Sequence, residues 1–527
     1  MAILVPLVLV AYLVLYAFAF PFTIPVARLP IQNFLGVGHA GEVQKPLRES
    51  LDGWIEQQER RALEKLLENV APGGRNVEDV VGGAVIASPS KEHPNYFYQW
   101  VRDAAITLST LVEIYADDTS SKRAPHISRI LDDYAQLQLK LQHTDNPSGT
   151  FDDLAGLGEP KFEADGRPFI GSWGRPQRDG PALRALTLME YVRAYNQSHP
   201  SLWKSDGDDD WYSLLYDASM PANSIIKADL EYVSHFWNQS GFDLWEEVDG
   251  LHFFTAMVQM RAMREGADLA RAFSDYGAAD WYNEQAERLS GFVQAFWDDK
   301  KGHLVETLNS DRTGLDCALL LGSLHGLPAS YSTDSPIYPP HSDEILVSLL
   351  ALVQDQRLRF PINAAPVSTE EDFPILEGVG IGRYPEDVYD GYGTDKRGGH
   401  PWFLCTASAA EVLFRTASYL TSTSNLTITQ TGLPFYEALL GSSSLDPESD
   451  TTYGPSDAIF HSIIEHLKST GDEFLDVIRT HTSGDGSMSE QFDRETGYER
   501  GAKDLTWSYG AFLKAVRARK SMGRSDE

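Results

Sequence analysis

Cysteine is nearly absent from the sequence, whose 527 residues include only Cys317 and Cys405. Both cysteines lie in apolar stretches with a helical pattern, LDCALLLGS and WFLCTASAA. Because a buried cysteine behaves as a small hydrophobic residue, we expect two buried free thiols. A disulfide bond between neighbouring helices is the alternative. The cysteine and histidine spacing of a zinc site is also missing.

Basic residues are scarce as well, with 44 Lys and Arg against 76 Asp and Glu, and the formal net charge is −32. A charge of this sign and size repels phosphate backbones and anionic membrane surfaces. We therefore do not expect nucleic acid as a partner. The acidic balance suits a protein that works in an acidic medium.

Two nucleotide-binding motifs are missing, the P-loop and the glycine-rich dinucleotide fingerprint. We therefore expect no organic cofactor and no catalytic metal. The chain also lacks an internal linker rich in Gly, Ser or Pro, and barrel architectures can remain one domain at this length.

The N-terminal segment has no basic residue before Arg28, although residues Ile3 to Phe20 are almost wholly apolar. Ala17 and Ala19 supply the small residues of a candidate cleavage site, so we predict a secretory signal over residues 1–19. An uncleaved membrane anchor is the alternative, because the apolar run approaches the length of a membrane span.

Sequons for N-glycosylation begin at Asn196, Asn238 and Asn425, whereas a proline excludes the one at Asn146. These sites favour a secreted protein, with a membrane-anchored or vacuolar protein as the alternative.

Helical periodicity recurs along the chain, and sustained alternation with a period of two is hard to find. Ala185, Leu188, Met189 and Val192 form one apolar face behind Pro181, a residue typical of a helix start. The pattern predicts an all-α fold with helices near 53–71, 103–117, 126–142, 181–197, 224–238, 251–275, 280–297, 314–325, 343–356, 401–420, 455–470, 473–481 and 505–516, the last capped by Asp504. Long segments between them, such as 150–180 and 378–401, are typical of functional loops.

Acidic residues gather in the short stretch SGFDLWEEVDG, where Asp243, Glu246 and Glu247 surround Trp245. A glycosidase needs two carboxyl groups across the scissile bond, one as acid and one as base or nucleophile. Glu490, far downstream in DGSMSEQFD, is a second candidate carboxylate. On local sequence alone, a solvated surface role is favoured for these acids, and Glu490 could also be a capping residue.

Six sequence blocks occur in order over about residues 82–517. They are YFYQWVRDAA, GSWGRPQRDGPALRA, SGFDLWEEVDG, GIGRYPEDVYDG, HPWFLCTASAAE and SEQFDRETGYERGAKDLTWSYGAFLKA. In sequence and order, these blocks resemble fungal glucoamylase, family 15 of the glycoside hydrolases. The resemblance implies an (α/α)6 barrel with its active site in a funnel at one end. It also implies a catalytic domain over about residues 51–520, an N-terminal extension over 20–50, a tail over 521–527 and no separate starch-binding domain.

The resemblance also implies catalytic roles. Glu246 matches the general acid, Glu490 matches the general base that holds the attacking water, and Glu247 matches a residue on the leaving-group side. Asp243 matches a supporting acid, although the local sequence also allows it as the base. Such a pair acts with inversion of configuration.

Residues that match the family's sugar-binding positions occur in four of the blocks. They are Tyr96, Trp100, Arg102, Asp103, Trp173, Arg175, Arg383, Asp387 and Trp402. Phe492, Asp249 and the basic segment around Lys396 and Arg397 depart from the family pattern, which puts the outer subsites in doubt.

These observations predict a secreted, monomeric enzyme that releases glucose from non-reducing ends of starch-like α-glucans, both oligosaccharides and polysaccharides. It would act on α-1,4 bonds and more slowly on α-1,6 bonds. The alternatives are an exo-glucosidase that prefers isomaltose or dextran ends, a non-catalytic glucan-binding protein, and a cell-surface structural protein held by the N-terminal segment.

Overall fold

The computed structural model describes residues 50–199, 210–328, 336–364, 375–441 and 443–522. The predicted signal or anchor and the N-terminal extension to residue 49 lie outside these ranges. Over the ranges described, no helix combines the length and apolarity needed to cross a membrane.

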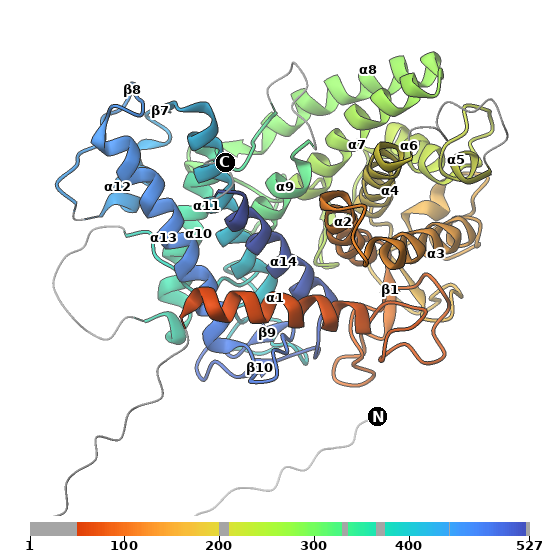
Figure 1. The fold of residues 1–527 in the computed structure, drawn as a ribbon, viewed down its shortest axis with the longest axis horizontal. Helices are drawn as coiled ribbons and strands as arrows, with labels where there is room; N and C mark the ends of the chain where they lie inside the picture. Colours follow the sequence, from red (N-terminus) through yellow and green to blue (C-terminus); the bar gives the residue numbers. More distant parts are fainter. Residues whose placement is uncertain (1–49, 200–209, 329–335, 365–374, 442, 523–527) are drawn as a thin grey trace, which may run out of the picture. The chain divides into compact units, whose positions relative to one another are not determined.

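Helices dominate the described residues and confirm the all-α class (Figure 1). The α-helices are α1 (Leu51–Glu68), α2 (Val101–Asp117), α3 (Ala124–Gln142), α4 (Asp179–Ser198), α5 (Asp210–Leu215), α6 (Ile225–Phe236), α7 (Phe253–Ala272), α8 (Tyr276–Val293), α9 (Ala318–Gly326), α10 (Asp343–Arg359), α11 (Phe403–Thr423), α12 (Leu433–Leu440), α13 (Ala458–His481) and α14 (Thr506–Ser521). Short 3₁₀ helices cover η1 (Ala155–Gly158), η2 (Gln294–Phe296) and η3 (Pro361–Asn363).

Six inner helices form a closed ring, in which α2 packs on α4, α4 on α7, α7 on α9, α9 on α11, α11 on α14, and α14 again on α2. Six outer helices alternate with them along the chain, so that α1, α3, α6, α8, α10 and α13 pack on α14, α2, α4, α7, α9 and α11 respectively. Twelve helices in this order make an (α/α)6 barrel, which confirms the architecture that the family resemblance implied.

The pattern of buried side chains along a helix distinguishes the inner helices from the outer ones. In α11, every side chain from Phe403 to Phe414 is buried, whether apolar or polar. In α13, the buried residues recur every three or four positions, as at Ile459, Ile463, Leu467 and Phe474. A helix buried on all sides belongs to the inner ring, whereas one apolar stripe is enough for an outer helix.

Short antiparallel ribbons shape the loops between the helices, and all of them except β7–β8, which precedes the outer helix α13, lie before inner helices. The pairs are β1 (Tyr98–Trp100) with β2 (Lys161–Glu163), β3 (Gly241–Phe242) with β4 (Asp249–Gly250), β5 (Trp297–Asp298) with β6 (His303–Leu304), β7 (Leu426–Ile428) with β8 (Thr451–Tyr453), and β9 (Gln491–Phe492) with β10 (Glu499–Arg500). The SGFDLWEEVDG stretch therefore folds as a β-hairpin, with Asp243 to Val248 as its loop.

Some local predictions were wrong. Asp504 does not cap α14, because the carboxylate accepts a hydrogen bond from the hydroxyl of Tyr509 instead. The stretches predicted near 455–470 and 473–481 are one continuous helix, α13. The short helices α5 and α12 were not predicted.

The prediction of two free thiols was also wrong, because Cys317 and Cys405 form a disulfide with a Cα–Cα distance of 5.7 Å. Cys317 directly precedes α9 and Cys405 lies in the first turn of α11. These inner helices are neighbours in the ring, and 88 residues of sequence separate the two cysteines.

Candidate active site

A cavity of about 440 Å³ lies where the inner helices begin. Its walls come from residues that precede or start α2, α4, α7, α11 and α14. Ten of the thirteen residues predicted from the sequence for catalysis and sugar binding line it, namely Tyr96, Trp100, Arg102, Asp103, Trp173, Glu246, Glu247, Arg383, Trp402 and Glu490.

Glu246 is held in the loop of the β3–β4 hairpin with a backbone φ of 69°, in the left-handed region that glutamate rarely adopts. Its Oε1 accepts hydrogen bonds from Nε1 of Trp100 at 2.6 Å, Nε2 of Gln177 at 3.0 Å and Nη2 of Arg102 at 3.4 Å. Because three donors converge on Oε1, Oε2 is the oxygen that can carry a proton.

Asp243 shapes this loop from behind. Its Oδ1 accepts hydrogen bonds from the backbone N–H groups of Glu247 at 2.7 Å and Val248 at 2.9 Å. Asp243 is buried, and it is not among the described residues that line the cavity. This placement favours the supporting role over the base role.

Glu247 occupies a different electrostatic environment from Glu246. Arg383 and Arg312 donate to its carboxylate at 2.9 and 2.8 Å, and the hydroxyl of Tyr384 also donates to it. Burial raises its pKa, but Arg383, Tyr384 and Arg312 together hold the pKa below its usual value. Glu247 is therefore ionised, as suits a hydrogen-bond acceptor for a sugar.

Glu490 lies just before β9 and is fully buried. The hydroxyl of Tyr389 donates to its Oε2 at 3.1 Å. Burial raises the pKa of Glu490 to about 7, against the lowering effects of Tyr96, Arg383 and Tyr389. Gly501 makes room for the carboxylate, because a Cβ atom there would lie 2.2 Å from Oε2.

Arg102 and Asp103 start α2 side by side. Arg102 donates to Oε1 of Gln177 at 2.8 Å and to Oδ2 of Asp179 at 3.1 Å. Its Nε lies 3.4 Å from Oδ2 of Asp103. Burial raises the pKa of Asp103 to about 6, although Arg102 lowers it.

Four buried polar atoms of cavity-lining residues have no hydrogen-bond partner within the described part of the chain. They are Nε of Arg102 and Oδ2 of Asp103, which lie 3.4 Å apart as an ion pair, together with Nε1 of Trp402 and Oε1 of Glu490. Buried polar groups are normally hydrogen-bonded, so this set of donors and acceptors fits a ligand that carries several hydroxyl groups.

Aromatic rings provide apolar walls beside these polar atoms. Trp245 and Trp402 lie with ring centroids 5.5 Å apart, and Trp100 and Trp173 with centroids 6.1 Å apart. Trp173 is 37% exposed. Such rings can pack on the C–H faces of a sugar.

Arg175 and Asp387 hold other residues in place. Nε of Arg175 lies 2.8 Å from both carboxylate oxygens of Glu159, and Arg175 also donates to the carbonyl oxygens of Phe169 and Gly171. Asp387 accepts two hydrogen bonds from Arg383, at 2.6 and 2.9 Å. Neither is among the cavity-lining residues that the structure describes.

Sequence reasoning missed several residues of the site. Gln177 and Tyr389 hydrogen-bond the two catalytic candidates, and Asp179 anchors Arg102. They lie within the blocks GSWGRPQRDG and GRYPEDVYDG, which were noted for other residues. Lys161, in β2, had no sequence signal, and its ammonium group lies between aromatic rings next to the cavity.

The residues that depart from the family pattern stay outside the cavity lining as far as the structure describes it. Phe492 is fully buried and stacks on His481 with a centroid distance of 4.4 Å. Asp249 pairs with Phe242 in the β3–β4 ribbon. Lys396 and Arg397 follow the turn at Asp395, which Arg397 contacts at 2.7 Å.

Comparisons with known proteins agree with this geometry. The sequence pattern of the glycosyl hydrolases family 15 matches residues 60–517. A glucoamylase of Saccharomycopsis fibuligera is 37% identical over 495 residues, covering 90% of this chain and 91% of the relative. The chain belongs to glycosyl hydrolase family 15. Family membership makes it a glycoside hydrolase and confirms the resemblance drawn from the six blocks.

Solved structures of the family share the fold. A glucoamylase structure from Saccharomycopsis fibuligera gives a TM-score of 0.81 at 36% identity, covering 90% of this chain and 97% of that one. The family 15 glucoamylase of Hypocrea jecorina gives a TM-score of 0.78 at 36% identity, covering 90% of this chain and 73% of that one.

Other predicted sites can be placed on this family 15 fold. Asn238 and Asn425 are exposed, whereas Asn196 is half-buried within α4. Among the described residues, no group of three or more His, Cys, Asp or Glu is arranged to hold a metal ion.

Proposed function

We propose that the protein is a glucoamylase, which removes single glucose units from the non-reducing ends of starch-like α-glucans and releases β-glucose by inversion. The observation that carries the proposal is that Glu246 and Glu490 line one cavity whose buried polar atoms are left for a ligand with several hydroxyl groups. Relatives named glucoamylases support the choice of substrate.

The geometry supports the following sequence of events. Asp103 and Arg102 hydrogen-bond hydroxyls of the terminal glucose, while Trp245 and Trp402 pack on its ring. Oε2 of Glu246 gives its proton to the glycosidic oxygen, and the bond from that oxygen to the anomeric carbon breaks. The donors from Trp100, Gln177 and Arg102 then stabilise the carboxylate left on Glu246.

Water completes the reaction from the other face of the sugar. Glu490 accepts a proton from a water molecule as the water oxygen bonds to the anomeric carbon, so that the configuration inverts. The unpartnered Oε1 of Glu490 is the acceptor for this proton. The glucan chain that remains carries the proton from Glu246, and solvent restores both carboxyl groups.

We further propose slower cleavage of α-1,6 bonds, secretion of the enzyme as a monomer, and glycosylation at the exposed Asn238 and Asn425. Two catalytic carboxyl groups in one cavity argue against a glucan-binding protein without activity.

Proton NMR of maltoheptaose in the first minutes of reaction tests the proposal. We expect early β-glucose without accumulation of mid-length maltodextrins. Early α-glucose would overturn inversion, and mid-length products would overturn exo action. Cleavage of isomaltose or dextran ends in preference to maltoheptaose would instead favour the exo-glucosidase of the same fold.

Amide substitutions of the three acidic residues test their separate roles as general acid, general base and supporting residue. Glu246→Gln should lower kcat by roughly 10²–10⁴-fold while maltose binding is retained, because general acid catalysis acts only in the transition state. Glu490→Gln should be similarly severe. Asp243→Asn should be milder, because the amide can still accept hydrogen bonds from the loop N–H groups. An equal loss of kcat in Asp243→Asn and Glu490→Gln would contradict the assignment of Glu490, rather than Asp243, as the general base.

A further inference from the structure

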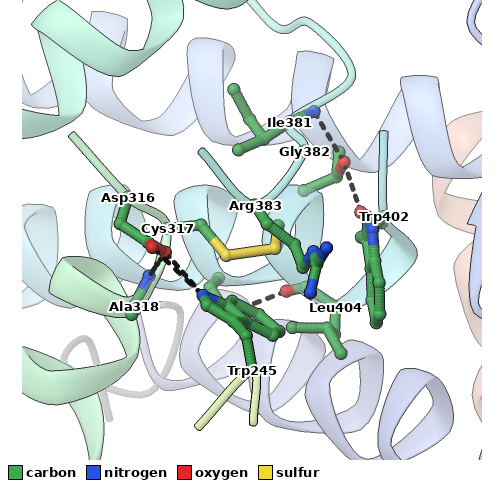
Figure 2. Close-up of a disulfide and its surroundings, with 12 residues drawn as sticks. Trp245, Asp316, Cys317, Ala318, Ile381, Gly382, Arg383, Trp402 and Leu404 are labelled. Carbon is green, nitrogen blue, oxygen red and sulfur yellow. Dashed lines mark hydrogen bonds between the residues drawn. A yellow bond between two sulfur atoms is a disulfide. The ribbon is translucent and has the colours of Figure 1, made fainter. Parts of the chain in front are cut away.

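The disulfide between Cys317 and Cys405 lies close to Trp245, Arg383 and Trp402 (Figure 2), three residues that line the cavity. Both cysteines are fully buried, and neither is among the described residues that line the cavity. The backbone N–H of Cys317 donates to the carbonyl oxygen of Arg383 at 2.8 Å. Cys405 follows Trp402 at the start of α11. The disulfide and this hydrogen bond together therefore connect three segments, of which two carry cavity-lining side chains.

Asp316, next to Cys317, connects this bond to the loop of the general acid. Nε1 of Trp245 lies 3.0 and 3.1 Å from the two carboxyl oxygens of Asp316. Oδ1 of Asp316 also accepts a hydrogen bond from the backbone N–H of Ala318 at 2.8 Å, at the start of α9. Asp316 is 4% exposed, so these contacts are shielded from bulk solvent. Trp245 is the residue before Glu246 in the chain.

Three side chains, Trp245, Arg383 and Trp402, pack against one another on the cavity side of Asp316 and the disulfide. The guanidinium carbon of Arg383 lies 5.3 Å from the ring centroid of Trp245 and 5.4 Å from that of Trp402. All three residues line the cavity. A shift of Trp245 would therefore move Arg383, Trp402 and the loop that carries Glu246.

We propose that Asp316 and the Cys317–Cys405 disulfide form a clamp that fixes Trp245, Arg383 and Trp402 as the sugar-binding wall. Asp316 is a positioning residue that acts through the indole N–H of Trp245. The clamp rests on the proposed function, since it concerns the same cavity and a sugar ligand.

A double-mutant cycle tests the action of Asp316 through Trp245. Asp316→Leu, which replaces the carboxyl group by a side chain of similar size without an acceptor, and Trp245→Phe should each lower kcat/KM for maltoheptaose by roughly tenfold, mainly through KM, because a misplaced wall weakens substrate positioning. Both substitutions remove the same hydrogen bond, so their losses should not add in the double variant. Additive losses would contradict the proposal, as would a lower Tm with native KM in Asp316→Leu.

The disulfide is tested separately, because reduction of the native protein affects no other cysteine. Thiol reduction, and the double variant Cys317→Ala with Cys405→Ala, should raise KM to the same extent, and reduction should leave the double variant unchanged. Leu467→Ala, buried in the outer helix α13, is the control for lost stability and should keep native KM. Native KM in both disulfide-free forms, assayed below their Tm, would overturn the clamp.

Calorimetry with maltose separates a failure of the clamp from a failure of the proposed function. A native protein that hydrolyses no α-glucan refutes the function. Maltose affinity that is equal in the oxidised and reduced proteins refutes the clamp, whatever the turnover.

Discussion

Glu490 must be ionised to act as a base, yet its burial favours the protonated form and raises its pKa to about 7. The hydroxyl of Tyr389 donates to Oε2 of Glu490 at 3.1 Å, and the hydroxyl of Tyr96 lies 3.1 Å from that of Tyr389. Hydrogen bonds to a carboxylate favour its ionised form. The two phenols therefore keep part of the Glu490 population available as base.

Removal of the Tyr389 hydroxyl should raise the pKa of Glu490 further. In Tyr389→Phe, we expect the acidic limb of the kcat/KM profile to move to higher pH by about one unit, the value of one hydrogen bond to a charged group. Tyr392→Phe is the control, because Tyr392 is exposed and outside the described cavity lining. A profile that is the same in native protein and Tyr389→Phe would separate Tyr389 from the base.

At the scale of elements, strand β2 contributes a buried cation that packs against aromatic residues of the cavity wall. Nζ of Lys161 lies 3.1 Å from the ring centroid of Trp173, 4.0 Å from that of Phe169, and 4.5 and 4.6 Å from those of Tyr98 and Trp100. Lys161 is 1% exposed, and burial lowers its pKa to about 8. The ammonium group thus joins β1 and β2 to the loop that carries Trp173.

Lys161→Met should release Trp173 from this position. A desolvated cation–π contact is worth about 2 kcal/mol, so we expect a lower Tm and a KM that rises by roughly tenfold. Lys91→Met is a matched control, because Lys91 lies 4.1 Å from the ring of Phe97 in an exposed position. Equal effects of the two substitutions on KM would show that Trp173 does not depend on Lys161.

At the scale of the whole molecule, ion pairs connect the inner helices along their later turns, around a second cavity of about 580 Å³. Glu265 of α7 accepts a hydrogen bond from Arg261 at 2.7 Å and contacts Arg193 of α4. Burial raises the pKa of Glu265, but Arg261 and Arg193 dominate and lower it from 4.5 to about 2. Burial also raises the pKa of Glu113, but Lys514 and two arginines outweigh this effect and lower the pKa to about 2.

Glu265 should therefore contribute to stability in acid. Because its pKa is lower in the folded than in the unfolded protein, the contribution is complete above pH 4.5 and is lost as the pH falls towards 2. Glu265→Gln should reduce the free energy of unfolding at pH 6 by about 3 kcal/mol. It should also flatten the dependence of stability on pH between those limits. Urea denaturation at several pH values measures both effects, with the exposed Glu284→Gln as control.

Much of this molecule could be predicted from the sequence. Helical periodicity gave the all-α class and most helix positions, because amphipathic spacing is a local property. The acidic loop around Glu246 could also be recognised from the sequence, because its residues are adjacent in the chain. Glu490 needed the family resemblance, since only the closed ring brings it to the same cavity as Glu246.

Other features depend on contacts that no local pattern records. Nothing in the apolar stretches around Cys317 and Cys405 indicates that α9 and α11 are neighbours in the ring. Gln177 and Tyr389 are residue types common in ordinary structure, and their roles follow only from the carboxylates they face. Lys161 has no such signal either, because its four aromatic partners come from two other segments, β1 and the loop that carries Phe169 and Trp173.

The common direction of the inner helices has an electrostatic consequence. Residues before or within the first turn of α2, α4, α7, α11 and α14 line the catalytic cavity, and Asp316 lies behind its wall at the start of α9. Each helix carries the equivalent of about half a positive elementary charge at its first turn. Six aligned peptide dipoles therefore surround the carboxyl groups with a positive potential, inside a protein whose net charge is −32. In the proposed mechanism, the barrel itself thus helps to accommodate the negative charge that remains on Glu246 when the glycosidic bond breaks.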